Sequence, residues 1–347
     1  MSTRGGPAGW FSSIWQERGA LAVLLLPLAA LFALVSSIRR GLFRVGVFAS
    51  GRLGVPAIVV GNITVGGSGK TPVVIWLVEQ LRARGYRPGV ISRGYGRSGD
   101  GVAEVRSDSP VEDVGDEPLL LARRVGCPVF VGRDRLAVAR ALLTAYPVCN
   151  LIVSDDGLQH YRLARDLEIV LFDSRGVGNG WLLPAGPLRE PVSRTRRADI
   201  LIANGELPKR LRARFPDADV FSMALEGARF VRLGRNQVAG VDRLRGRRLH
   251  AVAGIGNPPR FFAHLRSLGL EFEPHVFADH HAYRAWDLAF DGAEAVLMTE
   301  KDAVKCEAFA NQVGAELWAL RVDAHLDPDP LPLIEELLEK NHGSASA

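Results

Sequence analysis

Short apolar runs alternate with longer segments of mixed polarity in the first half of the chain. An apolar run of about four to eight residues is typical of a strand buried on both faces, whereas longer amphipathic segments predict helices. The predicted strands are 57–60, 89–92, 129–131, 151–154 and 167–172, and the predicted helices are 72–84, 118–125 and 134–145. This alternation predicts an α/β fold with a mainly parallel sheet that helices cover on both faces.

A segment rich in glycine and proline, 173–191, separates this pattern from a second one, and it is predicted to be a hinge or linker. The second pattern predicts a smaller α/β domain, with strands near 199–203, 218–222, 249–253, 295–298 and 316–321 and a helix at 259–268. We therefore expect an N-terminal anchor (1–49), a first domain (50–175), a second domain (176–325) and a C-terminal helix and tail (326–347).

The N-terminal run Ala20 to Ile38 contains no charged residue. As a helix, its 19 residues would span about 28 Å, which is close to the thickness of the hydrocarbon core of a membrane. A cleaved signal peptide fits poorly, because the run is long and arginines follow it. The segment is predicted to associate with a membrane, spanning it or lying in one leaflet; the alternative is a buried core helix. Arginines on its C-terminal side favour a cytoplasmic body.

The charge of the chain is concentrated in this same region. The whole chain has a formal net charge of +5, and residues 1–50 contain five arginines against Glu17 alone. The remaining residues are almost neutral, and this argues against a nucleic-acid partner. The three cysteines are too few and too scattered for a disulfide framework or a zinc site.

A glycine-rich loop follows the first predicted strand. Residues 61–71 read GNITVGGSGKT and precede an apolar helix, which is the context in which the pattern GxxxxGK[ST] predicts a phosphate-binding loop. Its backbone N–H groups and the helix N-terminus suit phosphate oxygens. Lys70 would reach the β- and γ-phosphates of ATP, and the Thr71 hydroxyl would bind Mg²⁺. Thr64 stands where the pattern has its first glycine. The predicted nucleotide-binding residues are Thr64, Val65, Gly66, Gly67, Ser68, Gly69, Lys70 and Thr71.

Two carboxylates end the predicted strand 151–154. Asp155 and Asp156 precede Gly157, and carboxylates at the end of a parallel strand beside a phosphate loop can hold Mg²⁺. The alternative is an ordinary Asp-Gly turn after a strand.

These motifs together resemble the tetraacyldisaccharide 4′-kinases, the lipid A 4′-kinases of Gram-negative bacteria. The matching stretches occur in the family's order: GNITVGGSGKTP (61–72), SRGYG (92–96), GDEP (115–118), GRDR (132–135), DDGLQH (155–160), LPAGPLREP (183–191), ADHHAY (278–283) and TEKDAVK (299–305). GGSGKT alone indicates only a nucleotide site, whereas DDGLQH, GPLREP and TEKDAVK together are much more specific.

The resemblance implies a P-loop kinase that transfers the γ-phosphate of ATP to the 4′-hydroxyl of a tetraacyldisaccharide 1-phosphate, forming lipid IVA. It implies ATP and Mg²⁺ as cofactors and a glycolipid substrate in the cytoplasmic leaflet of the inner membrane. The expected protein is a monomer, bound to that membrane through its N-terminal helix, with no nucleic-acid partner.

The resemblance also implies a catalytic pair. Asp116 is the expected base for the acceptor hydroxyl and His280 its partner, and Lys70 completes the expected catalytic residues. From the residues alone, the alternative for Asp116 is a helix N-cap, because Pro118 suits a first helical turn. We expect acceptor binding to close a cleft between the two domains and to bring Asp116 and His280 together.

Five further residues are weaker candidates for contact with nucleotide or acceptor: Arg93, Tyr95, Gln159, Arg189 and Lys301. Arg93 and Tyr95 could instead shape a loop after their strand. Arg189 and Lys301 adjoin Glu190 and Asp302, so local ion pairing is their alternative. A competing interpretation of the whole chain is a membrane-anchored P-loop NTPase that acts as a switch or assembly factor. Such a protein would need the phosphate loop but no acceptor site or base.

Overall fold

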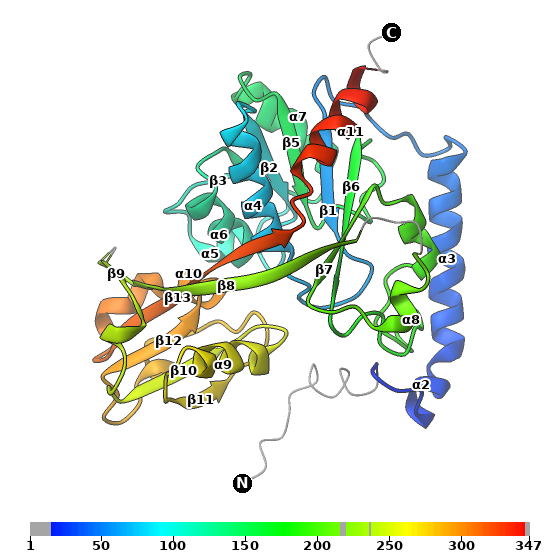
Figure 1. Ribbon diagram of the computed structural model, residues 1–347. Helices are drawn as coiled ribbons and strands as arrows, with labels where there is room; N and C mark the ends of the chain where they lie inside the picture. The colour runs from blue at the N-terminus through cyan, green and yellow to red at the C-terminus, as the bar shows by residue number, and fades with distance from the viewer. Residues whose placement is uncertain (1–14, 216–219, 236, 344–347) are drawn as a thin grey trace.

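All strands in the described part of the chain belong to one sheet. The computed structural model describes residues 15–215, 220–235 and 237–343, so the N-terminal 14 residues, the start of the predicted strand 218–222 and the last four residues lie outside it. The sheet has 13 strands in the order β11-β10-β12-β13-β8-β7-β6-β1-β5-β2-β4-β3, and β9 pairs with β8 outside this path (Figure 1).

The first half of the sheet is almost entirely parallel, as its apolar runs predict. Only its edge strand β3 runs antiparallel, to β4. In chain order this half contains β1 (Ala57–Gly61), β2 (Pro88–Ser92), β3 (Ala103–Val105), β4 (Val129–Val131), β5 (Leu151–Asp155), β6 (Leu167–Asp173) and β7 (Ile200–Asn204).

Both faces of this half are covered, which explains why most positions of its strands are apolar. On β6, Leu167, Ile169 and Leu171 join one core cluster, whereas Val170 and Phe172 join another on the opposite face. The helices of this half are α4 (Lys70–Ala83), α5 (Val111–Val114), α6 (Asp116–Arg124), α7 (Arg135–Ala145) and α8 (Lys209–Arg212). The C-terminal α11 (Leu331–Gly343) packs on the same core cluster as α4 and α6.

The second half is a smaller, mainly parallel group with its own core. It contains β9 (Gln237–Ala239), β10 (Leu249–Ala253), β11 (Glu273–Val276), β12 (Ala295–Thr299), α9 (Pro258–Ser267) and α10 (Glu300–Cys306). Short 3₁₀ helices lie at Val192–Arg197, Val241–Arg243, Ala285–Leu288 and Glu307–Gln312. Phe261, Phe262 and Leu265 of α9 pack against Ala251 and Leu297 of the strands beneath.

Two long strands join the halves. β8 (Val220–Arg232) and β13 (Glu316–Asp327) pair antiparallel along most of their length and run from one half to the other (Figure 1). The register of this pair shifts between Arg321 and Asp323, beside Gly227. A Cβ atom on Gly227 would lie 2.2 Å from the carbonyl oxygen of Arg321, so only glycine allows this close approach of the two backbones.

The sheet continues across the predicted domain boundary at 175/176. β7, which we expected in the second domain, pairs in parallel with β6 of the first, and β8 pairs with β7. The backbone hydrogen bonds of the sheet therefore cross the boundary at 175/176. The division into domains 50–175 and 176–325 stays a prediction. The expected fold class, a mainly parallel P-loop-like sheet with a smaller α/β part and an apolar N-terminal helix, is confirmed.

The N-terminal helix pair lies along one side of the body. α2 (Ala20–Leu24) leads into α3 (Leu26–Arg44), which Figure 1 shows as a long helix beside the first half. Within the described residues, α3 is the one helix long and apolar enough to cross a membrane. Leu28, Leu31 and Leu34 are each more than half exposed, so the alternative of a buried core helix is wrong.

Candidate active site

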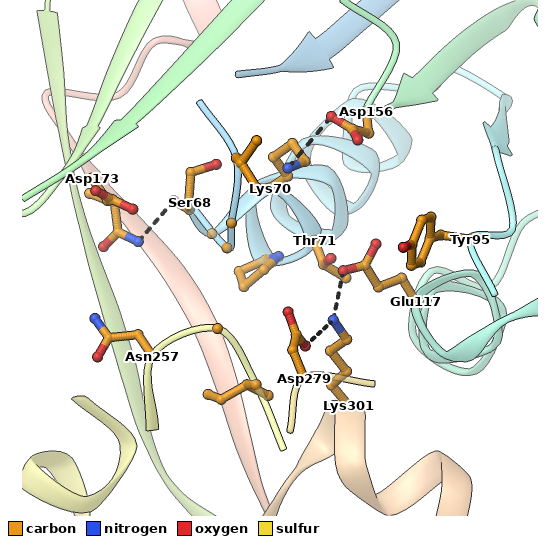
Figure 2. A pocket seen from close by; sticks show the side chains of 18 of the residues that line it. Ser68, Lys70, Thr71, Tyr95, Glu117, Asp156, Asp173, Asn257, Asp279 and Lys301 are labelled. Carbon is orange, nitrogen blue, oxygen red and sulfur yellow. Dashed lines mark hydrogen bonds and ion pairs between the residues drawn. The ribbon is translucent and has the colours of Figure 1, made fainter. Parts of the chain in front are cut away.

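A cavity of about 1110 Å³ lies where the two halves of the sheet meet. Its walls come from the glycine-rich loop, the end of β5, the start of α6, the loops after β10 and β11, the start of α10 and the C-terminal half of α3. Figure 2 shows the centre of this cavity around the first turn of α4. Loops at the carboxyl ends of parallel strands are where α/β proteins bind their ligands.

The glycine-rich loop has the backbone conformation of a phosphate cradle. Gly66 and Gly69 have φ angles of 101° and 92°, which a residue with a Cβ adopts only at a cost. A Cβ atom on Gly69 would also lie 2.6 Å from Nδ2 of Asn204. That amide donates a hydrogen bond of 3.1 Å to the carbonyl of Ser68, so β7 braces the loop directly before α4 begins.

Thr64 departs from the usual loop pattern without disturbing it. The residue forms an isolated antiparallel bridge with Leu188, and its φ angle is not positive. Its side chain accepts a hydrogen bond of 3.3 Å from the buried Asn62. A glycine is unnecessary here because the backbone needs no left-handed conformation.

Lys70 lies at the first position of α4 and points toward carboxylate and amide oxygens. Its Nζ lies 3.5 Å from Oδ1 of Asp156 and 3.3 Å from Oδ1 of Asn62 (Figure 2 shows the first of these). The neighbouring Thr71 also lines the cavity. The lysine is therefore extended along the mouth of the loop, with its charge already balanced by Asp156.

The two aspartates at the end of β5 have opposite electrostatic environments. Asp155 is 1% exposed, and burial together with Glu117 and Asp156 raises its pKa to about 7. Burial also opposes the ionisation of Asp156, but Lys70 and Arg189 outweigh it and lower the pKa of Asp156 to about 2. Groups whose pKa values are pushed apart in one cleft are typical of functional sites.

Asp155 is held from two sides and still has a free oxygen. Ser92 donates a hydrogen bond of 3.2 Å to Oδ2 of Asp155, while Oδ1 is buried and has no partner among the described residues. Arg135, itself only 1% exposed, donates to the main-chain carbonyl of Asp155 at 3.3 Å. Burial lowers the pKa of Arg135 to about 10.

Asp116 and His280 lie in direct contact across the junction of the two halves. Nδ1 of His280 is 2.9 Å from Oδ2 of Asp116, although 164 residues separate them in the chain. Burial alone would raise the pKa of Asp116. The hydrogen bond from His280 and the charge of Lys301 outweigh burial, so the pKa of Asp116 is lowered. The same hydrogen bond raises the pKa of His280.

Asp116 is not the N-cap of α6, the alternative that its sequence leaves open. It occupies the first helical position after Gly115, which is the N-cap and has a φ angle of 91°. The Asp116 carboxylate does accept a hydrogen bond of 2.9 Å from the backbone N–H of Glu117, and it also reaches His280. The structure thus brings the two expected catalytic residues into direct contact.

Lys301 lies at the centre of a charged cluster behind this pair. Its Nζ is 3.1 Å from Glu117, 3.3 Å from Asp279 and 3.4 Å from Nε2 of His280 (Figure 2 shows the first two). An ammonium facing Nε2 requires a lone pair there, so the proton of the neutral imidazole resides on Nδ1 and is donated to Asp116. Lys301 therefore orients His280.

The other predicted residues lie along the same cavity. Arg93 and Tyr95 are exposed on its rim, and the ring centroid of Tyr95 lies 5.1 Å from that of His280. The side chain of Gln159 donates to the main chain of Asn62 at 3.1 Å. Arg189 contacts both oxygens of Asp156 at 3.1–3.2 Å. All five weaker candidates, including Lys301, line one cavity with the phosphate loop.

Arg189 and Lys301 form ion pairs, but not with the carboxylates beside them in the chain. Glu190 is buried and pairs with Arg194 at 3.6 Å, and it accepts a hydrogen bond from Gln159 at 3.0 Å. Asp302 is bound by Lys305 at 2.8 Å. The side chains of adjacent residues diverge in these turns, so each charge finds a partner from another element or another helical turn.

Several residues of the site were not singled out from the sequence. Asn62, Ser92, Arg135 and Glu190 belong to the stretches quoted above, so those stretches contained the signal for them. Others lie outside those stretches or have no distinguishing local pattern; they are Arg39, Arg40, Asn204 and Arg260.

The site combines three features. A glycine-rich loop precedes a helix in a parallel sheet, two carboxylates end the adjacent strand β5, and the Asp116–His280 pair lies where the two halves meet. Together these features define a P-loop phosphotransferase. A model of the family described as Tetraacyldisaccharide-1-P 4′-kinase matches residues 21–341. The tetraacyldisaccharide 4′-kinase of Aromatoleum aromaticum is 52% identical over 336 residues, covering 96% of this chain and 98% of the relative. That of Dechloromonas aromatica is 53% identical and covers 95% and 98%.

A solved structure gives the same result. LpxK from Aquifex aeolicus, described as an "apo" form in complex with ATP, matches with a TM-score of 0.78 at 30% identity and covers 92% of this chain and 99% of that one. The chain belongs to the tetraacyldisaccharide 4′-kinase family, which confirms the resemblance seen in its motifs. It is an ATP-dependent kinase.

Proposed function

We propose that this site transfers the γ-phosphate of ATP to the 4′-hydroxyl of a tetraacyldisaccharide 1-phosphate, giving lipid IVA in lipid A biosynthesis. The observation that carries the proposal is the contact between Asp116 and His280, because His280 lines the same cavity as Lys70. The names of the relatives specify this substrate and position, and the ATP bound in the Aquifex aeolicus structure specifies the donor.

The donor phosphates would bind at the start of α4. Backbone N–H groups of residues 64–71 and the helix N-terminus attract phosphate oxygens. Lys70 then exchanges its contact with Asp156 for the β- and γ-phosphates, and its charge balances the charge that spreads over the transferred group.

The residues beside this loop fit Mg²⁺. Asp156 and Thr71 line the cavity, and Asp155 is buried next to Asp156 in the chain. All three carry oxygen atoms, which are the ligands that Mg²⁺ prefers, and Oδ1 of Asp155 has no other partner among the described residues. When bound, Mg²⁺ would neutralise charge on the β- and γ-phosphates. We propose these three residues as its ligands.

The acceptor hydroxyl would approach Asp116 from the cavity. The lowered pKa of Asp116 keeps its carboxylate ionised at neutral pH, so it can accept the proton of the 4′-hydroxyl. His280 keeps that carboxylate in one orientation by donating from Nδ1. Arg93, Tyr95, Gln159, Arg189 and Lys301 are proposed to contact nucleotide or acceptor from the walls.

The position of α3 supports membrane association. Phe32, Ser36, Arg39 and Arg40 of this helix line the same cavity as the phosphate loop, while leucines on its other side are exposed. A glycolipid held beside α3 would therefore keep its acyl chains near the membrane and place its sugar in the cavity. We propose that α3 binds the inner membrane, that the body faces the cytoplasm and that the protein acts as a monomer.

The switch or assembly-factor interpretation is not favoured. Such a protein needs no acceptor cavity and no second carboxylate, yet one cavity is lined by the phosphate loop, by Glu117 and His280, and by α3.

The decisive assay combines the detergent-solubilised chain, Mg-ATP and the disaccharide 1-phosphate, and analyses the product for a new 4′-phosphate. Lys70→Ala should lower turnover by at least about 100-fold, because the positive charge that stabilises the transferred phosphate is lost. Lys340→Ala, an exposed lysine on α11, is the matched control and should leave turnover unchanged. Full activity of Lys70→Ala would exclude the phosphate-loop assignment, and a product without 4′-phosphate would exclude the proposed reaction.

A further inference from the structure

Two histidines and a glutamate meet on one face of the sheet, away from the cavity described above. His250 lies on β10, and Glu273 and His275 lie on the adjacent edge strand β11. In the parallel register, His250 pairs with Glu273, and His275 is two residues further along β11. Side chains on a strand alternate between faces, so all three point to the same side. None of them lines the active-site cavity.

The ligand-forming atoms of the three side chains converge on one point. Nδ1 of His250 lies 2.9 Å from Nε2 of His275, and an Oε2 atom of Glu273 lies 3.8 Å from the same Nδ1. All three atoms lie within 4.8 Å of one another. Two nitrogens bound to one tetrahedral Zn²⁺ at 2.0–2.1 Å would be about 3.3 Å apart. The two nitrogens would therefore move apart by only about 0.4 Å, and the Glu273 oxygen already lies within 4.8 Å of both.

The surroundings hold the two rings in place and leave the carboxylate accessible. The ring of Phe290 stacks on both imidazoles, with centroid distances of 4.6 Å to His250 and 4.0 Å to His275. The side chain of Glu273 is 68% exposed. A metal ion could enter from the solvent side of the edge strand and meet two imidazoles whose orientation is already set.

We propose that His250, Glu273 and His275 form a binding site for Zn²⁺ or a similar divalent transition-metal ion. Without a metal, the two facing nitrogens and the carboxylate can share only one or two protons. A divalent cation would satisfy all three lone pairs at once. Imidazole nitrogens favour Zn²⁺, Ni²⁺ and Cu²⁺, whereas Mg²⁺ prefers oxygen, so this site would not compete for the magnesium of the kinase reaction.

A bound ion would tie the edge strand β11 to β10. β11 leads within four residues of Val276 to His280, so the metal would stabilise the strand from which the catalytic segment leaves the sheet. The proposal does not depend on the kinase assignment, because its test measures metal content and stability rather than turnover.

The test uses the full chain in detergent, without affinity tag, stripped by a chelator and free of ATP. ZnCl₂ is added in the presence of excess Mg²⁺, and both the zinc retained per chain and the unfolding temperature are measured. We expect His275→Asn to retain one zinc fewer per chain than the wild type and to weaken binding by at least about 100-fold. The matched control is His325→Asn, an exposed histidine on β13, which should retain the full zinc content.

A second variant keeps the test valid if His275→Asn folds poorly. Glu273→Gln changes an exposed side chain, so the fold should be unaffected, and zinc affinity should fall by roughly tenfold. Equal zinc content and equal zinc-dependent stabilisation in the wild type and both variants would overturn the proposal, as would a wild type that binds no zinc under these conditions.

Discussion

The imidazole of His280 donates from Nδ1 to the carboxylate of Asp116 at 2.9 Å and thereby links the two halves of the sheet. His280 has a φ angle of 60°, and Asp156 has one of 46°. Among the described residues these are the two non-glycine residues with positive φ. Such conformations cost about 1–3 kcal/mol each and persist only where the surroundings impose them. Both lie in the proposed active site.

This contact predicts how two substitutions combine. Asp116→Asn should lower kcat by about 10²–10⁴-fold, because an amide cannot accept the hydroxyl proton. His280→Gln should lower kcat less, since Asp116 keeps its charge but loses its orientation. The double variant should be about as slow as Asp116→Asn alone, because the two residues act as a unit. Steady-state kinetics on all three, with ATP binding measured separately, check this.

The neighbouring histidine provides the control for that series. His281 lies next to His280 but pairs with Asp287 at 3.3 Å and does not line the cavity. His281→Gln should therefore retain near-normal kcat. A double variant whose loss equals the product of the two single losses would argue against a coupled pair.

The raised pKa of Asp155 predicts the pH dependence of nucleotide use. Its carboxyl group is protonated below pH about 7 and ionised above, so kcat/KM for Mg-ATP should rise with pH through this value. Glu117 is the strongest charged neighbour that raises this pKa. Glu117→Gln removes that negative charge, lowers the pKa of Asp155 and should move the acidic limb of the profile to lower pH.

The exposed Glu112 of α5 offers a matched charge change. Glu112→Gln should leave the acidic limb in place. An unmoved limb in Glu117→Gln, or one displaced to higher pH, would contradict the assignment of the limb to Asp155.

A buried ion pair joins α6, which contains Asp116, to α10, which contains Lys301. Nη1 of Arg124 lies 2.7 Å from both carboxylate oxygens of Glu300, and the Arg124 side chain is 7% exposed. Arg124→Ala leaves the largely buried Glu300 with only the backbone N–H of Val322 as partner and should destabilise the protein by up to about 3–5 kcal/mol in denaturant unfolding. kcat should fall as well, because the helices that hold Asp116 and Lys301 lose their connection.

An exposed arginine–carboxylate ion pair serves as the control, because it has the same charges as Arg124–Glu300 but is not buried. Arg245 pairs with Asp242 at 2.9 Å, and the Asp242 side chain is 92% exposed. Arg245→Ala should cost less than about 1 kcal/mol. Similar losses for Arg124→Ala and Arg245→Ala would show that the α6–α10 pair has no special structural role.

The close approach of β8 and β13 predicts a steric effect at Gly227. In Gly227→Ala, the new methyl group would lie 2.2 Å from the carbonyl oxygen of Arg321, so one of two backbones must move. A loss of about 1–3 kcal/mol in stability is expected. Gly240→Ala places its methyl group in open space and should change stability by less than about 0.5 kcal/mol. Equal losses of stability in the two variants would mean that β8 and β13 can move apart at Gly227 without cost.

Local patterns in the sequence were sufficient for the elements and for the nucleotide end of the site. The strand predicted at 129–131 and those at 57–60 and 151–154 agree with β4, β1 and β5 to within one residue at each end. The phosphate loop lies between β1 and α4 as expected. These features depend on side-chain periodicity and on glycine chemistry within about ten residues, and neighbouring residues suffice to specify them.

Long-range pairing decided the rest. The sequence predicts a break after residue 175, but β7 and β8 continue the first sheet, and the antiparallel pairing of β8 with β13 carries it into the second half. Nothing in a strand's own residues specifies which distant strand its backbone will bond. Likewise, Glu190 and Asp302 each form an ion pair with a residue other than the cation beside them in the chain.

The sequence by itself determined that this protein has a phosphate loop, a mainly parallel sheet and a long apolar helix, because each depends on a contiguous pattern of residues. Only the tertiary structure decided that α3 forms a wall of the kinase cavity, that Asp116 contacts His280 across the two halves, and that His250 and His275 face each other from the adjacent strands β10 and β11. Side chains that are far apart in the chain become neighbours only when the sheet order and the crossing of its strands are established.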